Sequence, residues 1–235
     1  MSTELIVALD YADKVQALKL LQHIDPHRCA VKVGSEMFTL FGTDFVSSLT
    51  RQGYRVFLDL KFHDIPNTVA HACKAAADLG VWMLNLHAMG GRAMMQAASN
   101  ALAHQQGTRP HLIAVTVLTS MTDIDLPCIG IEGTVAQQVA RLASLTRESG
   151  LDGVVCSAHE VKAIKAVGGE DFLTITPGIR LADDSMDDQS RVVTPSHAKA
   201  LGSDFIVVGR PITRALNPQE VINQILQTLS FCHHE

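Results

Sequence analysis

Eight short apolar segments alternate with amphipathic segments along the 235 residues of the chain. Segments this short and this continuously apolar are typical of parallel strands that are buried on both faces. They span residues 5–9, 30–33, 55–60, 82–87, 112–118, 153–157, 173–176 and 205–208. Eight such units predict an α/β fold, a single-domain (β/α)8 TIM barrel over residues 1–235. A doubly wound open sheet is the alternative, but the chain has no G-x-G-x-x-G after its first strand.

The segments between the strands carry apolar residues at helical spacing. One set occupies residues 15–24, and similar sets occupy residues 135–145 and 221–229. Asn217-Pro218 predicts the start of the last helix, because Asn caps a helix and Pro is favoured at its first position. Glycines that follow helical segments just before a strand predict helix ends at Gly53, Gly80, Gly150 and Gly202.

Composition narrows the possible functions. The net charge is −5 and the Lys and Arg residues are scattered, so the basic patch of a nucleic-acid-binding protein is missing. No apolar stretch reaches the ~20 residues that span a membrane, and the N-terminus does not resemble a signal peptide. The five cysteines form no C-x-x-C pair, so we expect a cytoplasmic protein without a disulfide framework or zinc site. His63, His71 and His87 lack metal-ligand spacing, and we expect them to be packed or surface residues.

The order of strands predicts where the polar residues gather. In a (β/α)8 barrel the carboxyl ends of all strands meet at one rim, and active sites are built there. The residues expected at or near that rim are Asp10, Lys32, Asp59, Lys61, His87, Thr119, Pro177, Gly178, Gly209 and Arg210.

The third predicted strand runs directly into a cluster of charges. Side chains two apart on a strand share a face, so Asp59 and Lys61 should project together, while Asp64 lies beyond the strand. Lys32 interrupts another apolar run and must reach water or pair with Asp59 or Asp10. With Asp64, these residues would form an array of alternating charges that titrates as a unit and marks a candidate active site. A strand-end salt bridge beside a solvated loop is the simpler alternative.

The last two strands point to a phosphate site. Gly209-Arg210-Pro211 follows the eighth strand, where glycine allows close approach to backbone N–H groups and Arg210 offers a two-pronged donor. Barrels often bind phosphate after strands seven and eight, although a turn glycine and a surface arginine would give the same residues. The polar segment 182–191 follows the seventh strand, and we interpret it as a lid rather than a solvated excursion.

With these residues, the chain resembles the bacterial type of the orotidine 5′-phosphate decarboxylase family over nearly its whole length. The most specific element is the family's D-x-K-x-x-D motif, present as Asp59, Lys61 and Asp64. Five further blocks agree in order and spacing: residues 7–10, 31–34, 117–121, 176–180 and 208–211.

The resemblance implies a homodimeric barrel that converts orotidine 5′-monophosphate to UMP and CO2 without metal or organic cofactor. Lys61 would protonate C6, with Asp59 against the substrate carboxylate and Lys32 beside it. Asp64 and Thr68 would act across the dimer interface. The remaining contacts implied are Asp10 and Lys32 to ribose, Thr119 to the pyrimidine, and Gln189, Gly209, Arg210 and Arg180 at the phosphate.

Two other functions remain open from the sequence. The sugar-phosphate branch of the same superfamily shares the D-x-K-x-x-D segment but uses Mg²⁺. Residues 65–68 and 119–121 favour the pyrimidine branch. A catalytically silent barrel that binds a phosphate ligand is the third hypothesis, and it leaves the crowded charges beside the phosphate site without a purpose.

Overall fold

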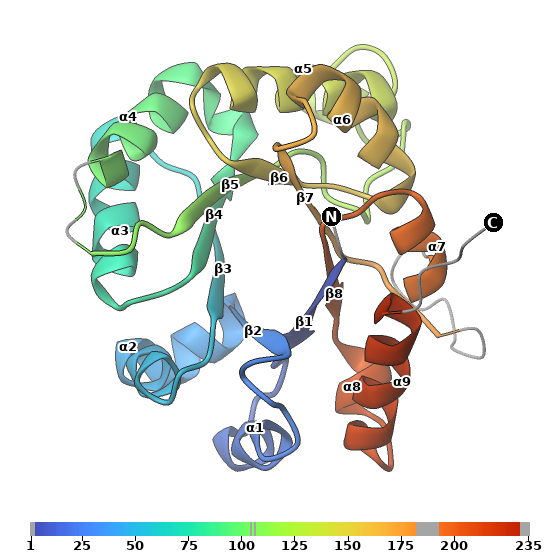
Figure 1. Cartoon of the computed structure of the whole chain (residues 1–235). Helices are drawn as coiled ribbons and strands as arrows, with labels where there is room; N and C mark the ends of the chain where they lie inside the picture. The colour runs from blue at the N-terminus through green and yellow to red at the C-terminus, as the bar shows by residue number, and fades with distance from the viewer. Residues whose placement is uncertain (1–2, 104, 106, 182–192, 231–235) are drawn as a thin grey trace.

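The structure, a computed structural model, describes residues 3–103, 105, 107–181 and 193–230. Its eight parallel strands pair in sequence order, and β8 pairs with β1 to close a barrel, as Figure 1 shows. The strands are β1 (Glu4–Ala8), β2 (Cys29–Gly34), β3 (Val56–Phe62), β4 (Met83–His87), β5 (His111–Val115), β6 (Gly153–Val155), β7 (Leu173–Thr176) and β8 (Phe205–Val208). The (β/α)8 barrel predicted from the sequence is therefore confirmed.

Helices surround the barrel (Figure 1). They are α1 (Lys14–Leu21), α2 (Ser35–Arg51), α3 (Pro66–Asp78), α4 (Gly91–Ala103), α5 (Val135–Glu148), α6 (Val161–Gly168), α7 (Pro195–Ala200), α8 (Arg210–Thr213) and α9 (Pro218–Ser230), with short 3-10 turns η1 (Ala88–Gly90), η2 (Pro127–Ile129) and η3 (Ala158–Glu160). Asn217 precedes α9 as predicted, and its side chain accepts a hydrogen bond from the Glu220 N–H at 3.3 Å. The four predicted helix-ending glycines all have φ between 76° and 90°.

Two strand ends differ from the sequence prediction. β3 continues to Phe62, so Lys61 belongs to the strand. β5 ends at Val115, so Thr119 lies in the following loop rather than at the strand end. Just after β5, the Val155 carbonyl accepts from both the Thr116 hydroxyl at 3.0 Å and the Thr116 backbone N–H at 3.5 Å.

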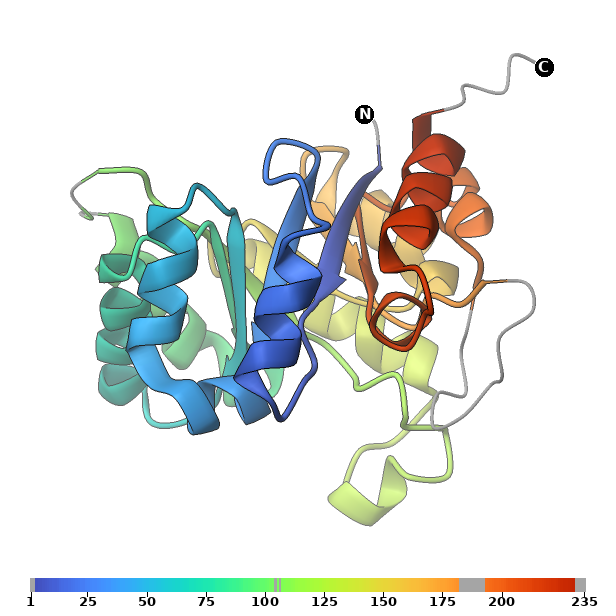
Figure 2. The same ribbon diagram turned by 90° about the horizontal axis from the view of Figure 1, so that it is seen from below.

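The long connection after β5 is the largest excursion from the barrel. It carries η2 and rejoins the fold at α5, whose capping box joins Thr134 and Gln137. Figure 2 shows it projecting on the side of the molecule opposite the N-terminus. Within the described part of the chain, no helix is both long and apolar enough to cross a membrane.

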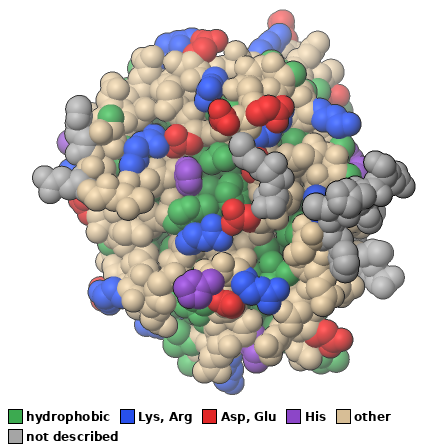
Figure 3. All heavy atoms as spheres, viewed as in Figure 1, with side chains coloured by type: hydrophobic (Ala, Val, Ile, Leu, Met, Phe, Trp, Pro, Cys, Tyr) green, Lys and Arg blue, Asp and Glu red, His purple; other side chains and the backbone are tan. Residues whose placement is uncertain are grey.

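Two layers of apolar side chains hold the barrel together. Residues between the strands and helices form the larger core, and a smaller cluster fills the barrel interior. That interior cluster contains Ile6, Ala8, Ala30, Phe57, Met83, Ile113, Ile175, Phe205 and Val207. On the face drawn in Figure 3, apolar side chains gather at the centre, and basic and acidic side chains are interspersed around them.

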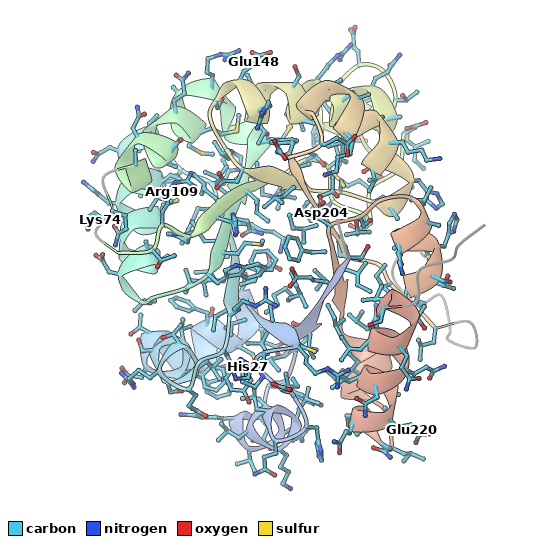
Figure 4. All side chains as sticks on the ribbon, viewed as in Figure 1. His27, Lys74, Arg109, Glu148, Asp204 and Glu220 are labelled. Atoms are coloured by element: carbon cyan, nitrogen blue, oxygen red, sulfur yellow. The ribbon has the colours of Figure 1, made fainter. Side chains whose placement is uncertain are left out.

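Ion pairs fasten the amino ends of the strands, opposite the rim with the predicted site. Asp204 lies just before β8, and it accepts hydrogen bonds from Lys165 Nζ at 2.8 Å and the Thr174 backbone N–H at 2.7 Å. Asp152 accepts from Arg109 at 2.8 Å in the same way before β6. Figure 4 labels Arg109 and Asp204, which lie on different sides of the ring of strands. These contacts tie adjacent strands together far from the predicted chemistry.

Asp204→Ala should lower the free energy of unfolding by about 3 kcal/mol, because it leaves the Lys165 ammonium buried without its carboxylate. Urea denaturation followed by circular dichroism measures this change. Lys74→Ala is the control, since it removes an exposed ion pair with Asp78 and should leave stability almost unchanged. An Asp204→Ala variant as stable as Lys74→Ala would contradict the assignment.

Candidate active site

A cavity of about 260 Å³ opens at the carboxyl ends of the strands. Its floor is apolar, formed by side chains such as Phe57, Val155, Ile175 and Val207. Eight of the residues predicted for the site line it: Asp10, Lys32, Asp59, Lys61, Thr119, Arg180, Gly209 and Arg210. The structure therefore brings together residues from β2 and β3 and from the segments that follow β1, β5, β7 and β8.

Four of these residues form a continuous chain of alternating charges along the cavity wall. Lys32 Nζ lies 2.9 Å from Asp10 Oδ1 and 3.5 Å from Asp59 Oδ2. Lys61 Nζ lies 2.7 Å from Asp59 Oδ1. Lys32 thus pairs with both of the carboxylates that the sequence offered as alternatives. The Lys32 and Asp59 side chains in the middle of the array are 11% and 13% exposed, whereas Asp10 and Lys61 at its two ends are 54% and 36% exposed.

Mutual neutralisation keeps the buried members of this array charged. Burial alone would raise the pKa of Asp59, but Lys32, Lys61 and the hydrogen bonds that it accepts hold its pKa below the ordinary value. Burial likewise works to lower the pKa of Lys32, and the carboxylates of Asp10 and Asp59 outweigh it and raise that pKa. The array therefore presents fixed charges of both signs to anything bound in the cavity.

Asn85 on β4 is a site residue that the sequence reasoning missed. Its side chain is fully buried, donates to Asp59 Oδ1 at 2.7 Å and accepts from the Lys61 backbone N–H at 2.8 Å. Lys61 itself has φ 53°, the one positive φ among the described non-glycine residues. The available signal was a polar residue inside the apolar run Met83-Leu84-Asn85-Leu86, because buried amides require hydrogen-bond partners.

The residues predicted to bind the phosphate lie close to neighbouring groups of the protein. Gly209 lies between β8 and α8, and a Cβ there would come within 3.3 Å of Asp10 Oδ2. Arg180 is 8% exposed and donates to the Ile179 carbonyl at 2.9 Å, which orients its guanidinium beside the cavity. Gln189 and the proposed lid at residues 182–191 lie outside the described residues.

Asp64 and Thr68 do not join the cavity of their own chain. Both are exposed, Asp64 just after β3 and Thr68 in the first turn of α3. Asp64 Oδ1 accepts from the Ile65 N–H at 2.6 Å. Among the described residues no ion pair joins Asp64 to Lys61, so the expected extension of the charge array to Asp64 is wrong within one chain. Asp10 extends the opposite end of the array, beside Lys32.

The three histidines considered as metal ligands are placed as the sequence reasoning expected. His63 and His71 are exposed, and His87 is partly buried at the end of β4. The His63 and His87 rings lie 5.7 Å apart. Burial, followed by the nearby His63 and Lys61, lowers the pKa of His87. Among the described residues, no three His, Cys, Asp or Glu side chains are grouped to hold a metal ion.

A closed (β/α)8 barrel with a charged cavity at the carboxyl ends of its strands has the architecture of a barrel enzyme. The sequence narrows this class further. Over residues 3–225 it matches the family described as Orotidine 5'-phosphate decarboxylase / HUMPS, and the chain belongs to that family.

Relatives with curated names agree. The orotidine 5'-phosphate decarboxylase of Legionella pneumophila (strain Corby) is 57% identical over 229 residues, which cover 97% of this chain and 100% of that protein. The enzyme of the same name from Chromobacterium violaceum is 56% identical, covering 97% and 92%. The crystal structure of orotidine 5'-phosphate decarboxylase from Lactobacillus acidophilus superposes with a TM-score of 0.87 at 43% identity, covering 97% and 100%. The resemblance drawn from the sequence motifs is confirmed.

The lowered pKa of Asp59 gives a pH prediction. A carboxyl with a depressed folded-state pKa stabilises the fold above its unfolded pKa, near 4, and that contribution is lost as pH falls through the folded-state value. Wild type should therefore lose more stability between about pH 6 and pH 3 than Asp59→Asn does. Urea midpoints at several pH values measure this, with the exposed Asp44→Asn as a control that follows wild type. Identical acid profiles for wild type and Asp59→Asn would refute the coupling.

Proposed function

We propose that the chain converts orotidine 5′-monophosphate to UMP and CO2. The observation that carries the proposal is the Asp10, Lys32, Asp59 and Lys61 charge array on the cavity wall. The array occurs in a chain 57% identical to a curated decarboxylase of that name. The enzyme is a carboxy-lyase of de novo pyrimidine biosynthesis, and its reaction needs a charged, preorganised site rather than a hydrophobic one.

Lys61 carries the chemical step. When the bond between C6 and the carboxylate breaks, CO2 leaves and the electron pair stays at C6. That pair lies in the plane of the ring, where the π system does not delocalise it. A preorganised ammonium stabilises such a charge electrostatically, and the Lys61 ammonium then donates its proton to C6. The exposure of Lys61 toward the cavity supports this role.

Asp59 and Lys32, whose side chains are less exposed than that of Lys61, support the same step. Asp59 holds the Lys61 ammonium at 2.7 Å and faces the substrate carboxylate, while Lys32 balances its charge. Because the cavity floor is apolar, these charges act in a medium of low dielectric, where electrostatic effects are stronger than in water. The charge supplied by two lysines fits a reaction that uses neither metal nor organic cofactor.

The rest of the cavity accommodates the nucleotide. Asp10 and Lys32 bind ribose hydroxyls, and Thr119 contacts the pyrimidine. Arg210, Gly209 and Arg180 bind the phosphate, with Gln189 assigned there by family resemblance. The support is that those of these residues that the structure describes all line one cavity at the barrel rim.

The functional unit is a homodimer in which Asp64 and Thr68 complete the partner's site. Both residues are exposed, and neither lines the cavity of its own chain. Large apolar side chains are exposed in the segments after β3, β4 and β5, at the same end of the barrel: Ile65 at 67%, Met89 at 41%, Ile124 at 82% and Ile129 at 55%. An exposed apolar surface of this kind is typical of a subunit interface.

A cytoplasmic location also belongs to this proposal, supported by the free thiols of Cys29, Cys73, Cys128 and Cys156.

The family itself spans more than one chemistry, so the Mg²⁺-dependent sugar-phosphate branch is the second candidate. The curated relatives at 56–57% identity carry the pyrimidine enzyme's name and do not favour that branch. A silent binding barrel has no use for the buried Asp59 carboxylate and its two ammonium partners. Neither alternative is supported by a separate observation.

The direct test is the ultraviolet absorbance of orotidine 5′-monophosphate with purified protein in excess EDTA. Loss of the orotate chromophore with appearance of UMP is expected. Lys61→Ala should lower kcat at least about 10³-fold, because the proton donor and the stabilising charge are both lost. The exposed Lys162→Ala is the matched control and should turn over like wild type. Near-normal turnover by folded Lys61→Ala would reject its role.

Mixed dimers test the shared site. Asp59→Ala and Asp64→Ala dimers should each be nearly inactive, but subunit exchange creates hybrids with one site that has both aspartates. Equal mixing should restore about a quarter of wild-type activity, since half of the dimers are hybrids and half of their sites are intact. Exchange is verified with a size-tagged subunit and native mass spectrometry. Complete exchange without recovered activity would refute the contribution of Asp64 across the interface.

A further inference from the structure

We infer that Asn85 is a positioning residue for this reaction, which fixes the Lys61 backbone and the Asp59 carboxylate in a single arrangement. The inference rests on the proposed decarboxylation and adds a residue to its machinery. Asn85 does not line the cavity. It therefore acts through the two residues that it contacts rather than on the substrate.

The first argument is the irregular pairing of β3 with β4. Leu58 lies opposite Leu84 and Phe62 opposite Leu86, so four steps along β3 match two steps along β4. Such a bulge removes regular ladder partners from the extra residues and redirects their side chains. Lys61 lies within this bulge with φ 53°, a conformation that L residues adopt only when their surroundings hold them there.

The Asn85 side chain replaces the missing ladder partner. Its Oδ1 accepts the Lys61 backbone N–H at 2.8 Å across the bulge. Since that N–H can only donate, the amide atom facing it must be the oxygen. The amide of Asn85 thus holds Lys61 in the left-handed conformation that directs its ammonium to Asp59.

The orientation of Asn85 Oδ1 toward the Lys61 N–H also determines the hydrogen bond that Asn85 Nδ2 makes. With Oδ1 toward Lys61, Nδ2 faces Asp59 Oδ1 at 2.7 Å and can only donate to it. That oxygen also receives the Lys61 ammonium at 2.7 Å, while Oδ2 faces Lys32. The carboxylate is therefore held from three sides as an ionised acceptor, and its plane is set by Asn85.

A purely structural role would have different consequences. A buried, hydrogen-bonded amide stabilises any fold, and its loss would lower the melting temperature without changing catalysis. A positioning role predicts that Lys61 and Asp59 shift relative to each other when Asn85 is removed. Because the ribose and phosphate contacts lie elsewhere in the cavity, kcat should fall while KM and UMP affinity stay close to wild type.

The experiment compares wild type, Asn85→Ala and Thr174→Val in the EDTA assay, with melting temperatures and UMP affinity measured alongside. Asn85→Ala should reduce kcat about 100-fold, as expected for small displacements of reacting groups. Thr174 is an equally buried polar residue on β7 that bonds Asp204 away from the site. Thr174→Val should lower the melting temperature and leave kcat unchanged.

Asn85→Asp provides a readout that a structural role would not move, and it also decides the matter should Asn85→Ala fail to fold. One oxygen of the new carboxyl still accepts from Lys61 N–H. The other donates to Asp59 only when protonated and repels it when ionised. Full burial and the adjacent Asp59 carboxylate raise the pKa of a carboxyl at this position well above its ordinary value. The ratio of kcat for Asn85→Asp to that of wild type should therefore rise as pH falls from about 8 to about 6. Asn85 contacts Asp59 and Lys61, and Lys32 and His87 are the further charged or titratable groups beside those two residues. Both enzymes carry all four groups, so the comparison with wild type isolates the effect of the new carboxyl.

The outcomes separate the two proposals. No turnover by wild type would reject the decarboxylase function, and the role of Asn85 would fall with it. Active wild type together with an Asn85→Ala variant whose kcat matches that of Thr174→Val would overturn the positioning role alone. A ratio for Asn85→Asp that does not change with pH would overturn it equally.

Discussion

The Asp59 carboxylate, whose side chain is only 13% exposed where β3 reaches the barrel rim, is the constraint on which the rest of the site depends. A charge in that position is tolerated only because two ammonium groups and an amide N–H surround it. Each of these partners depends on a further feature of the structure. Lys32 is also paired with Asp10, and Lys61 reaches Asp59 from a left-handed backbone conformation. Asn85 bonds to the Lys61 backbone because the bulge in β3 leaves that N–H without a regular ladder partner. The array is therefore a set of mutually dependent residues, in which the loss of any one leaves another buried charge or dipole unsatisfied.

The ion pairs that stabilise the fold and the residues proposed for the reaction lie at opposite ends of the barrel. Ion pairs before β6 and β8 tie neighbouring strands at the amino ends, and the apolar interior fills the space between those pairs and the site. The interior also lowers the local dielectric beneath Asp59, which strengthens the interaction of the array with a developing negative charge. The barrel can thus hold four close charges at one end because packing and ion pairs at the other end supply its stability.

The sequence predicted the features that depend on periodicity and missed those that depend on pairing across strands. Eight apolar runs, the last helix at Asn217-Pro218 and the pairing of Lys32 all follow from what a single segment requires. The bulge in β3 does not, because residues 55–60 read as the regular strand that was predicted there, and only the register of β3 with β4 reveals two extra residues. The partners of Asn85 likewise lie on another strand, although a polar residue inside an apolar run could have drawn attention to it. The fifth strand was predicted to reach residue 118, with Thr119 at its end, whereas β5 ends at Val115. Asp64 was placed in the array because sequence distance does not show in which direction a loop residue turns.

The end of the array and the closure of the barrel coincide at the junction of β1 and β8. Asp10, which neutralises Lys32, follows β1, and Gly209 follows β8, the strand that pairs with β1. A Cβ at position 209 would lie 3.3 Å from Asp10 Oδ2, which is close enough to displace the carboxylate by a few tenths of an ångström. The glycine that the sequence marked as a phosphate-binding element thus also leaves room for Asp10. Its absence of a side chain keeps Asp10 in reach of Lys32 and, through Lys32, keeps the charge on Asp59 balanced.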